Sequence, residues 1–269
     1  SDYGGYRPQY QGFGVTTPGG RGGQILKVTH LKDTTNTSSP DWNGSFRKAL
    51  TSTGSRIIAF EVCGVIQGAG PLAITEPYFT IAGQTAGGQG VELRGFSEFQ
   101  ILTHDWVIQH LKFRQGVVGG GLQGAIELGP MGSGQNGPPI YNGVFDHVSI
   151  SYGYGYGLPS HNGNSQQPTD ITFTDSFLGQ GLAGGVGTVV PYTANAMLMY
   201  PQLASGFPQS TRTIARSIFA LHGNRNPWFG AGWEVHDINN VKYQPQDLSD
   251  GGNDGFVQIM ACGYSGDGG

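Results

Sequence analysis

A short strand, a two-residue corner with a polar first member and a second short strand recur along this chain, and this unit constrains the fold most. The first members of the aligned corners are 37, 28, 41 and 23 residues apart. Hairpins recur at shorter, more even intervals, whereas stacked coils keep their strands in register while loop lengths vary. The unit therefore favours a parallel β-helix, and ordinary β-turns are the alternative that spacing leaves open. The corners are His110-Leu111, His147-Val148, Asp175-Ser176, Arg216-Ser217 and Asn239-Asn240.

Stacking also gives these corners a role. A single coil exposes an apolar inner face and unpaired backbone groups, and the next coil covers both. Ser217 and Asn240 are candidates for an inward ladder that pairs with equivalent positions one coil above and below.

Composition supports an all-β fold. The chain has 48 glycines, yet 37% of its 269 residues are hydrophobic and it contains 12 Tyr and 14 Phe, which is typical of a packed, turn-rich protein rather than a disordered one. Helical periodicity is confined to residues 43–54, where Asn43 is the expected cap and Gly54 the expected end.

Charge and cysteine usage exclude several classes. With a net charge of −4 and no basic cluster, nucleic acid is not an expected partner. No apolar run reaches the roughly 20 residues of a membrane helix, so no membrane insertion is expected. Cys63 and Cys262 lack metal-site spacing. In a β-helix they lie several coils apart, so both are expected to be free thiols.

Eight sequence blocks resemble the pectate lyase family in the family's order, across nearly all of residues 12–245. They imply a right-handed parallel β-helix with a short N-terminal helix covering its open end. We expect a single domain over residues 1–269, with an extension at 1–11 and an irregular tail at 245–269. The blocks are "GFGVTTPGGRGGQILKVTHL", "GSFRKAL", "RIIAFEVCGVI", "PYFTIAGQTAGGQGVELRG", "VIQHLKFR", "FDHVSISYG", "SIFALHGNRNP" and "INNVKY".

The resemblance implies cleavage of acidic polysaccharide by β-elimination. The proton on uronate C5 is removed only if the adjacent carboxylate is neutralised and the developing anion is stabilised. Family members neutralise it with Ca²⁺ held by aspartate and glutamate, and an arginine in the "RxP" block is the base. By position that arginine is Arg225 in "NRNP". Since guanidinium normally stays protonated, Arg225 is a base only in a strongly cationic site.

The calcium-binding carboxylates and the additional basic residues that such a base requires are missing from the expected positions. Gly124 replaces an aspartate, "YGYGYGLPS" (152–160) supplies no carboxylate, Asn195 replaces a lysine, and "WFG" follows "RNP" without a second basic residue. No cofactor and no metal site are therefore predicted, although Ca²⁺ is the family expectation.

Four other carboxylates in this region are weak metal candidates. Strand alternation predicts that Glu127 and Gly124 lie on opposite faces. Asp146 is expected to bond to the backbone, and Asp170 and Asp175 to be a strand-edge and a corner residue.

Further candidates for substrate binding lie in three stretches. Arg225 and Lys112 are candidate anchors of a uronate carboxylate, with a surface ion pair as the alternative. Arg114 is a further candidate binding residue, which faces either the groove or solvent. His222 is a candidate binding residue, with a hydrogen-bonded structural histidine as the default. The third stretch contains Tyr152, Tyr154 and Tyr156. In an extended strand these alternate tyrosines share one face and would form a sugar-stacking platform; a flexible glycine-rich loop is the alternative.

Three functions follow as hypotheses. The favoured one is a β-helix that recognises acidic polysaccharide with weakened or lost calcium-dependent elimination. The second is an active polysaccharide lyase with Arg225 as base, and the third is a spike or fibre component of a virus particle or cell surface. All three place the protein outside the cell or on a virion or cell surface. The sequence ends at "GYSGDGG", which predicts an exposed last coil. A homo-oligomer or a neighbouring subunit would cover it, and a sequence trimmed from a longer chain is the alternative.

Overall fold

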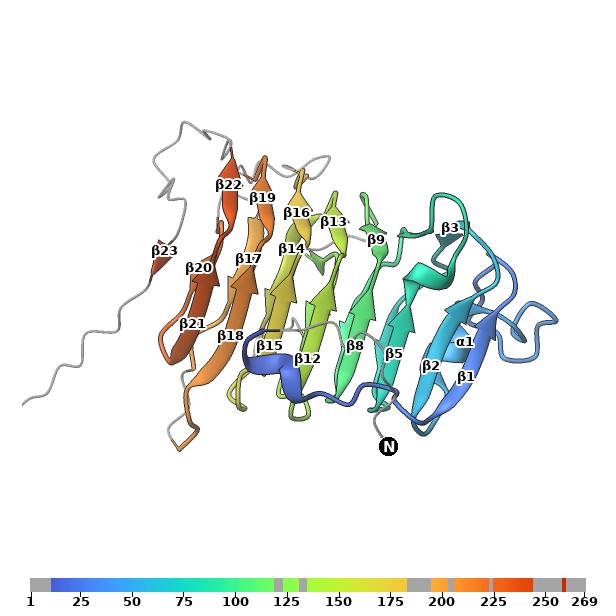
Figure 1. Cartoon of the computed structure of the whole chain (residues 1–269), viewed down its shortest axis with the longest axis horizontal. Helices are drawn as coiled ribbons and strands as arrows, with labels where there is room; N and C mark the ends of the chain where they lie inside the picture. Colours follow the sequence, from blue (N-terminus) through green and yellow to red (C-terminus); the bar gives the residue numbers. More distant parts are fainter. Residues whose placement is uncertain are drawn as a thin grey trace, which may run out of the picture.

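Three parallel sheets form the computed structural model, which describes residues 11–118, 123–130, 135–182, 195–202, 206–222, 225–243 and 258–259. Successive strands along the chain go to different sheets, and each strand pairs with its equivalent in the next coil. Figure 1 shows these coils stacked side by side from β1 to β21. The predicted parallel β-helix is confirmed.

Each sheet takes one strand from each successive coil. Sheet A consists of β1 (Gln24–Val28), β2 (Arg56–Phe60), β5 (Phe79–Ala82), β8 (Trp106–Gln109), β12 (Tyr141–Asp146), β15 (Thr169–Thr174), β18 (Ser210–Ala215) and β21 (Trp233–Ile238). Sheet B consists of β3 (Gly64–Gln67), β6 (Val91–Arg94), β9 (Leu111–Arg114), β13 (Ser149–Ser151), β16 (Phe177–Gly179), β19 (Ile218–Ala220) and β22 (Val241–Tyr243).

Sheet C takes the strand that follows sheet B in each coil and precedes the sheet A strand of the next coil. It consists of β4 (Leu72–Ile74), β7 (Phe99–Ile101), β11 (Glu127–Leu128), β14 (Gly155–Ser160), β17 (Asn195–Met199), β20 (Trp228–Phe229) and β23 (Gln258–Ile259). The short β10 (Gln123–Gly124) also pairs with β14. Two 3₁₀ turns complete the elements, η1 (Phe13–Thr16) and η2 (Gly83–Thr85).

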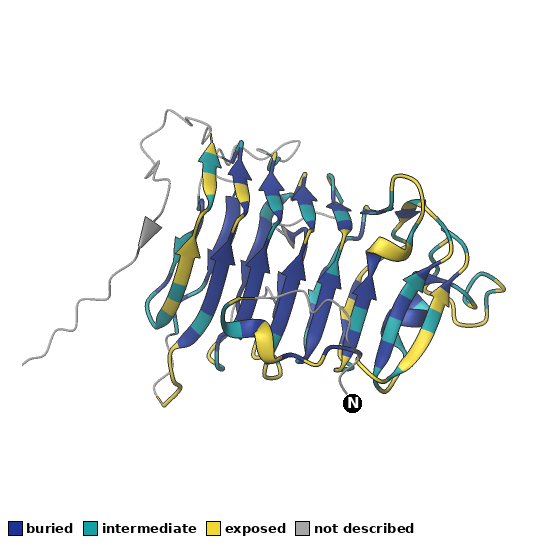
Figure 2. Cartoon of the chain, in the orientation of Figure 1, coloured by how far each residue is buried: buried dark blue, intermediate teal, exposed yellow. Residues whose placement is uncertain are grey.

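The core runs through the middle of the coil as stacked apolar side chains, and Figure 2 shows the central strands buried along most of their length. The ring of Trp106 packs on Phe145 at 4.7 Å, and Phe145 packs on Phe173 at 6.0 Å. Each coil therefore covers the apolar face of its neighbour, as the recurring strand–corner–strand unit predicts.

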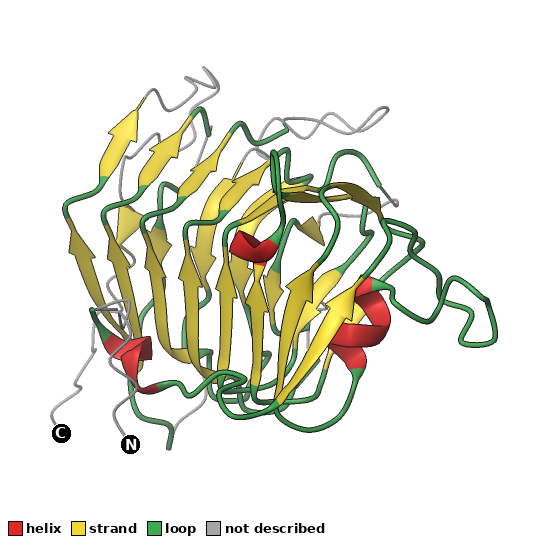
Figure 3. Ribbon diagram, turned by 45° about the vertical axis from the view of Figure 1, so that its right-hand side comes forward, coloured by secondary structure: helices red, strands yellow, loops and turns green. Residues whose placement is uncertain are grey.

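The short helix α1 (Phe46–Thr51) lies beside one end of the core, where Figure 3 shows it next to the first strands. Phe46 and Leu50 are fully buried there. The predicted cap was wrong: the Ser45 side chain accepts from the Lys48 N–H, while Asn43 Oδ1 accepts from Lys48 Nζ. In the described part of the chain no helix has the length and apolar character needed to cross a membrane.

The aligned corners share one backbone geometry. The first residue of each pair is left-handed, with φ between 50° and 53°, so its side chain projects from the junction of sheets A and B. The inward ladder is also confirmed. Ser217 N–H donates to Asn240 Oδ1 at 2.8 Å, and Ser176 N–H donates to Ser217 Oγ at 3.2 Å.

The predicted boundaries and thiols are only partly within the described residues. Cys63 is exposed and free, whereas Cys262 lies outside the described residues. Of the predicted extension at 1–11 only Gln11 is described, and of the predicted tail at 245–269 only β23, which pairs with β20. These boundaries stay predictions.

Candidate functional site

Three of the positions at which the sequence departs from the pattern of the family it resembles lie side by side on sheet C. Tyr156 in β14 pairs with Gly124 in β10 on one side and with Asn195 in β17 on the other. The stacking of coils thus brings residues far apart in the sequence into one row. None of these three side chains is a carboxylate.

Arg225 lies against this row. Its backbone is left-handed (φ 55°) in the turn before β20, and its carbonyl accepts from the Met197 N–H at 2.9 Å. Its Nη1 donates to the Tyr156 hydroxyl at 2.6 Å. The guanidinium carbon also lies 5.1 Å from the centre of the Tyr156 ring and 5.3 Å from that of Trp228. Two aromatic rings thus flank the half-buried guanidinium beside sheet C.

Glu127 lies beside Gly124, and the prediction of opposite faces was wrong. Its Oε1 accepts from the Gly124 N–H and its Oε2 from Gln100 Nε2, both at 2.9 Å. A side chain at position 124 would approach the Glu127 Cγ to 3.0 Å. The chain bends at residues 125 and 126, between β10 and β11, and this bend breaks the alternation of a continuous strand.

Burial changes the acidity of Glu127. The side chain is fully buried, and this burial raises the pKa of Glu127 to about 7 against the two hydrogen bonds that favour its ionised form. A strongly perturbed carboxyl beside a candidate site is a feature that sequence alternation alone missed.

The raised pKa predicts that stability falls as the pH rises from 4.5 to about 7. In that window the unfolded chain loses the Glu127 proton while the folded protein retains it, and the total effect is up to roughly 3 kcal/mol. We expect the stability of Glu127→Gln relative to the parent to be higher at pH 8 than at pH 5. Urea unfolding at both pH values measures this difference.

A matched control for this prediction is Glu61→Gln, which changes an exposed carboxylate after β2 whose ion-pair partner, Lys27, is a lysine. It should shift stability equally at both pH values. A Glu127→Gln difference that is independent of pH would contradict the raised pKa.

The donors around this row do not fit the calcium site implied by the resemblance. Calcium in proteins takes six to eight oxygen ligands, several of them from carboxylates. Among the described residues of the row the neighbours are an amide, a phenol and a glycine, and the cation of Arg225 lies against them. The Glu127 carboxylate beside the row already accepts two hydrogen bonds.

The three predicted platform tyrosines are not on one extended strand. Tyr152 is a left-handed residue (φ 58°), and Gly155 has φ 105°, so strand alternation does not set their directions. Tyr154 N–H donates to Gln115 Oε1 at 2.9 Å, whereas Tyr156 lies on β14 and meets Arg225. The structure therefore brings one of the three tyrosines to Arg225.

The other predicted binding residues lie elsewhere. Lys112 and Arg114 are on β9 of sheet B, three coils before the coil of Arg225, or about 14 Å along the axis. Lys112 Nζ donates to the Gln89 carbonyl at 2.7 Å, and Arg114 Nη2 to Ser149 Oγ at 2.8 Å. His222 is 1% exposed, so a polymer on the surface does not reach its ring.

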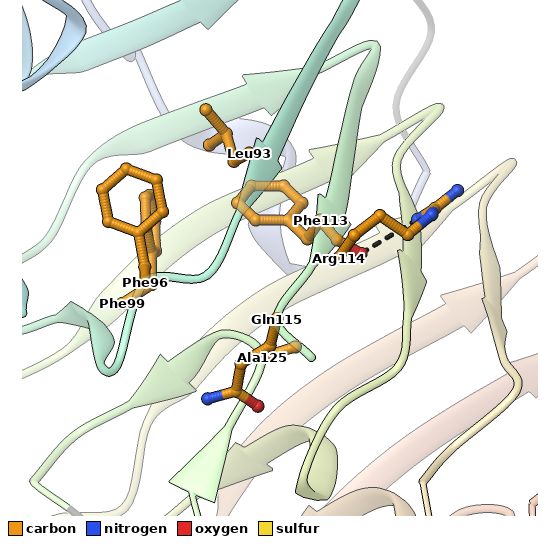
Figure 4. Close-up of a pocket in the computed structure, with 7 residues that line it drawn as sticks. All are labelled: Leu93, Phe96, Phe99, Phe113, Arg114, Gln115 and Ala125. Atoms are coloured by element: carbon orange, nitrogen blue, oxygen red, sulfur yellow. Dashed lines mark hydrogen bonds between the residues drawn. The ribbon is translucent and has the colours of Figure 1, made fainter. Parts of the chain in front are cut away.

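Arg114 also borders a small cavity, which does not extend the site. Figure 4 shows aromatic rings on one side and the Arg114 guanidinium directed away from them. The amide of Gln115 already binds the Gly124 carbonyl and the Tyr154 N–H. The lining is Leu93, Phe96, Phe99, Phe113, Arg114, Gln115 and Ala125.

Asp146 does not have the predicted backbone-bonding role. Its Oδ1 lies 2.5 Å from His147 Nδ1, and its Oδ2 accepts from Gln109 Nε2 at 3.0 Å. Asp170 lies in β15, where its Oδ1 accepts from Thr211 Oγ1, and Asp175 is a corner residue as expected.

Comparisons with known proteins agree with this architecture. "Probable pectate lyase C" of Emericella nidulans is 34% identical over 178 residues, which make up 65% of this chain and 36% of that protein. The protein of the same name from Aspergillus fumigatus is 34% identical over 175 residues, with the same two coverages. The chain thus spans about a third of the length of the curated relatives it matches.

A solved structure matches more of the chain. Jun a 1, described as the major allergen from cedar pollen, has a TM-score of 0.56 and 18% sequence identity, over 93% of this chain and 75% of its own. At this identity the likeness shows the fold alone. No protein-family model matches the chain.

Proposed function

Because this chain is a pectate-lyase-like β-helix protein and a distant homologue of the probable pectate lyases C, we propose that it binds an acidic polysaccharide along the outer side of sheet C. Arg225 is the anchor for a uronate carboxylate, and Tyr156 and Trp228 are the rings nearest to it. Such polymers are too large to enter cells, so the place of action is outside the cell.

The observation that carries this proposal is the setting of Arg225. An N–H of its guanidinium donates to the Tyr156 hydroxyl, and the cation lies over two aromatic rings. An arginine in such a setting offers N–H donors to a carboxylate, and arginine in proteins binds carboxylates rather than accepting protons. The arrangement therefore suits carboxylate recognition better than base catalysis.

Calcium-dependent β-elimination is weakened or lost in this proposal. Neutralising the uronate carboxylate needs cationic charge, and the donors at Gly124, Tyr156 and Asn195 do not replace a set of calcium-binding carboxylates. In the described part of the chain Arg225 then supplies that charge, and charge that binds the ground state does not by itself remove the C5 proton.

We expect Arg225→Gln to weaken binding to polygalacturonate about tenfold or more, since a charge-assisted hydrogen bond contributes about 1.5–3 kcal/mol. Binding is measured by affinity electrophoresis and calorimetry. The matched control is Arg94→Gln, because Arg94 is an exposed arginine of sheet B that pairs with Glu92. Its affinity should equal that of the parent.

The same samples are assayed for the unsaturated product by its absorbance, with added calcium and with chelator. Little or no product from a parent that binds polygalacturonate supports the proposal. Product that forms readily and disappears in Arg225→Lys would instead make the protein a lyase with Arg225 as base. Absence of binding to uronate polymers would refute the recognition role itself.

A further inference from the structure

A second cluster of chemically active side chains lies far from Arg225, at the junction of sheets A and B. His110, Asp146 and His147 each offer one ligand atom there, and these atoms lie within 4.8 Å of one another. The residues come from two successive coils: His110 lies between β8 and β9, Asp146 ends β12, and His147 follows it before β13. The proposed function uses none of them.

Backbone geometry places the two histidines together. Both occupy the left-handed corner position, with φ 52° at His110 and 53° at His147. Because the corners stack in register, the rings lie parallel, with centroids 4.7 Å apart and an interplanar angle of 20°. Both rings are exposed, so an ion reaches their nitrogens from solvent.

Asp146 provides a fixed carboxylate beneath this pair. It is 5% exposed, Gln109 Nε2 donates to its Oδ2, and its Oδ1 lies 2.5 Å from His147 Nδ1. This carboxylate oxygen and this ring nitrogen are close enough to bind one ion together, and metal binding then displaces the proton they share.

The charges around the cluster do not oppose a cation. Asp175 occupies the corner one coil beyond His147. The positive charge of Arg216, one coil further, is balanced by that carboxylate, since Arg216 Nη2 lies 2.7 Å from Asp175 Oδ2. Two carboxylates and one paired arginine thus surround two imidazoles.

We propose that His110, His147 and Asp146 form a binding site for a divalent transition metal ion of the zinc class. Two imidazoles and one carboxylate suit zinc and its neighbours, whereas calcium and magnesium prefer oxygen ligands alone. Zinc–nitrogen bonds of about 2.0–2.1 Å set tetrahedral ligands about 3.3 Å apart, and rotation of exposed side chains closes that distance from 4.8 Å or less. Water fills the open position.

Such an ion would join two coils at the surface. The ligands belong to consecutive turns, so the bound ion adds a cross-link that exists only in the folded protein. Binding to the folded state alone raises stability by mass action. The ion would therefore stabilise the β-helix as a structural ion, at a site separate from the polysaccharide-binding site proposed at Arg225.

The test uses the intact chain after treatment with chelator. ZnCl₂ is titrated in competition with a chromophoric chelator, and Co²⁺ absorption reports the ligand field. The variants are His110→Asn and His147→Asn, because Asn239 occupies the equivalent left-handed corner in this chain and shows that asparagine fits it. The matched control is His236→Asn, which removes an exposed histidine that lies near Glu234 and outside the cluster.

We expect one Zn²⁺ per chain in the parent and in His236→Asn, with affinity about tenfold or more weaker in each corner variant. Zn²⁺ should raise the melting temperature of the parent and not that of the double corner variant. Equal Zn²⁺ affinity in parent and corner variants, or no Zn²⁺ binding by the parent, would overturn the site.

Discussion

Replacing Arg56 with methionine should lower the free energy of unfolding by about 3–5 kcal/mol, as expected when a buried charge that is fully hydrogen-bonded is removed. Arg56 is fully buried on β2, beside the helix that covers the end of the core. Urea unfolding of parent and variant measures the difference.

The size of this effect follows from the partners of the guanidinium. Nε and Nη2 donate to the Leu50 carbonyl at 3.1 and 2.6 Å. Nη1 donates to the carbonyls of Gly54 and Pro77, and Nη2 also to that of Glu76. One side chain thus satisfies four carbonyls, from the last turn of α1, the segment that follows it and the loop before β5. Methionine fills the volume and leaves all four without this donor.

Two further variants test the explanation. Arg56→Lys keeps the charge but cannot reach four carbonyls with a planar fork, so an intermediate loss is expected. Arg94→Met, at an exposed position, should change stability by no more than about 0.5 kcal/mol. If Arg56→Met were as stable as the parent, the carbonyl cluster would not hold the helix end in place.

The corner pattern predicted the fold because each coil of a β-helix repeats the same turn between two short strands. Ser217 and Asn240 bond between adjacent coils as expected, and the corner histidines, aspartate, arginine and asparagine share one left-handed geometry. Asparagine and aspartate tolerate that geometry better than most residues. The same alignment also places His110 above His147, although the sequence analysis drew no metal site from it.

The candidate site was less predictable because local bends and long-range contacts decide it. The "NRNP" block located Arg225, but not the rings of Tyr156 and Trp228 around it. Alternation failed at Glu127, where the chain bends between two short strands. Periodicity describes regular strands, and the residues that matter here lie at their interruptions.

Buried arginines are a second feature that the sequence did not predict. Arginine is usually exposed, so nothing in the pattern marks Arg56 and Arg212 as interior residues. Both are on sheet A and fully buried, yet their surroundings differ. Arg56 has a complete set of acceptors, which Arg212 does not have among the described residues.

Arg212→Met is expected to raise the free energy of unfolding by about 1–4 kcal/mol, as when a buried charge is replaced by an apolar side chain of similar volume. In the described part of the chain, none of the Arg212 guanidinium nitrogens has a hydrogen-bond partner. Its observed contact is with the Trp233 ring, 5.2 Å from the guanidinium carbon. A cation–π contact of about 2 kcal/mol when desolvated does not offset the loss of hydration.

The acidity of Arg212 leads to the same expectation. Burial lowers the pKa of Arg212 to about 9, well below the value of an arginine in the unfolded chain. Between these values the unfolded chain binds more protons, so stability increases as the pH rises through that window, and at neutral pH the full cost of burying the charge is present. Methionine removes this cost at neutral pH, where urea unfolding is measured.

Arg212→Lys, which buries a more strongly hydrated charge, should be less stable than the parent. A less stable Arg212→Met would contradict the argument that burial of this charge costs stability.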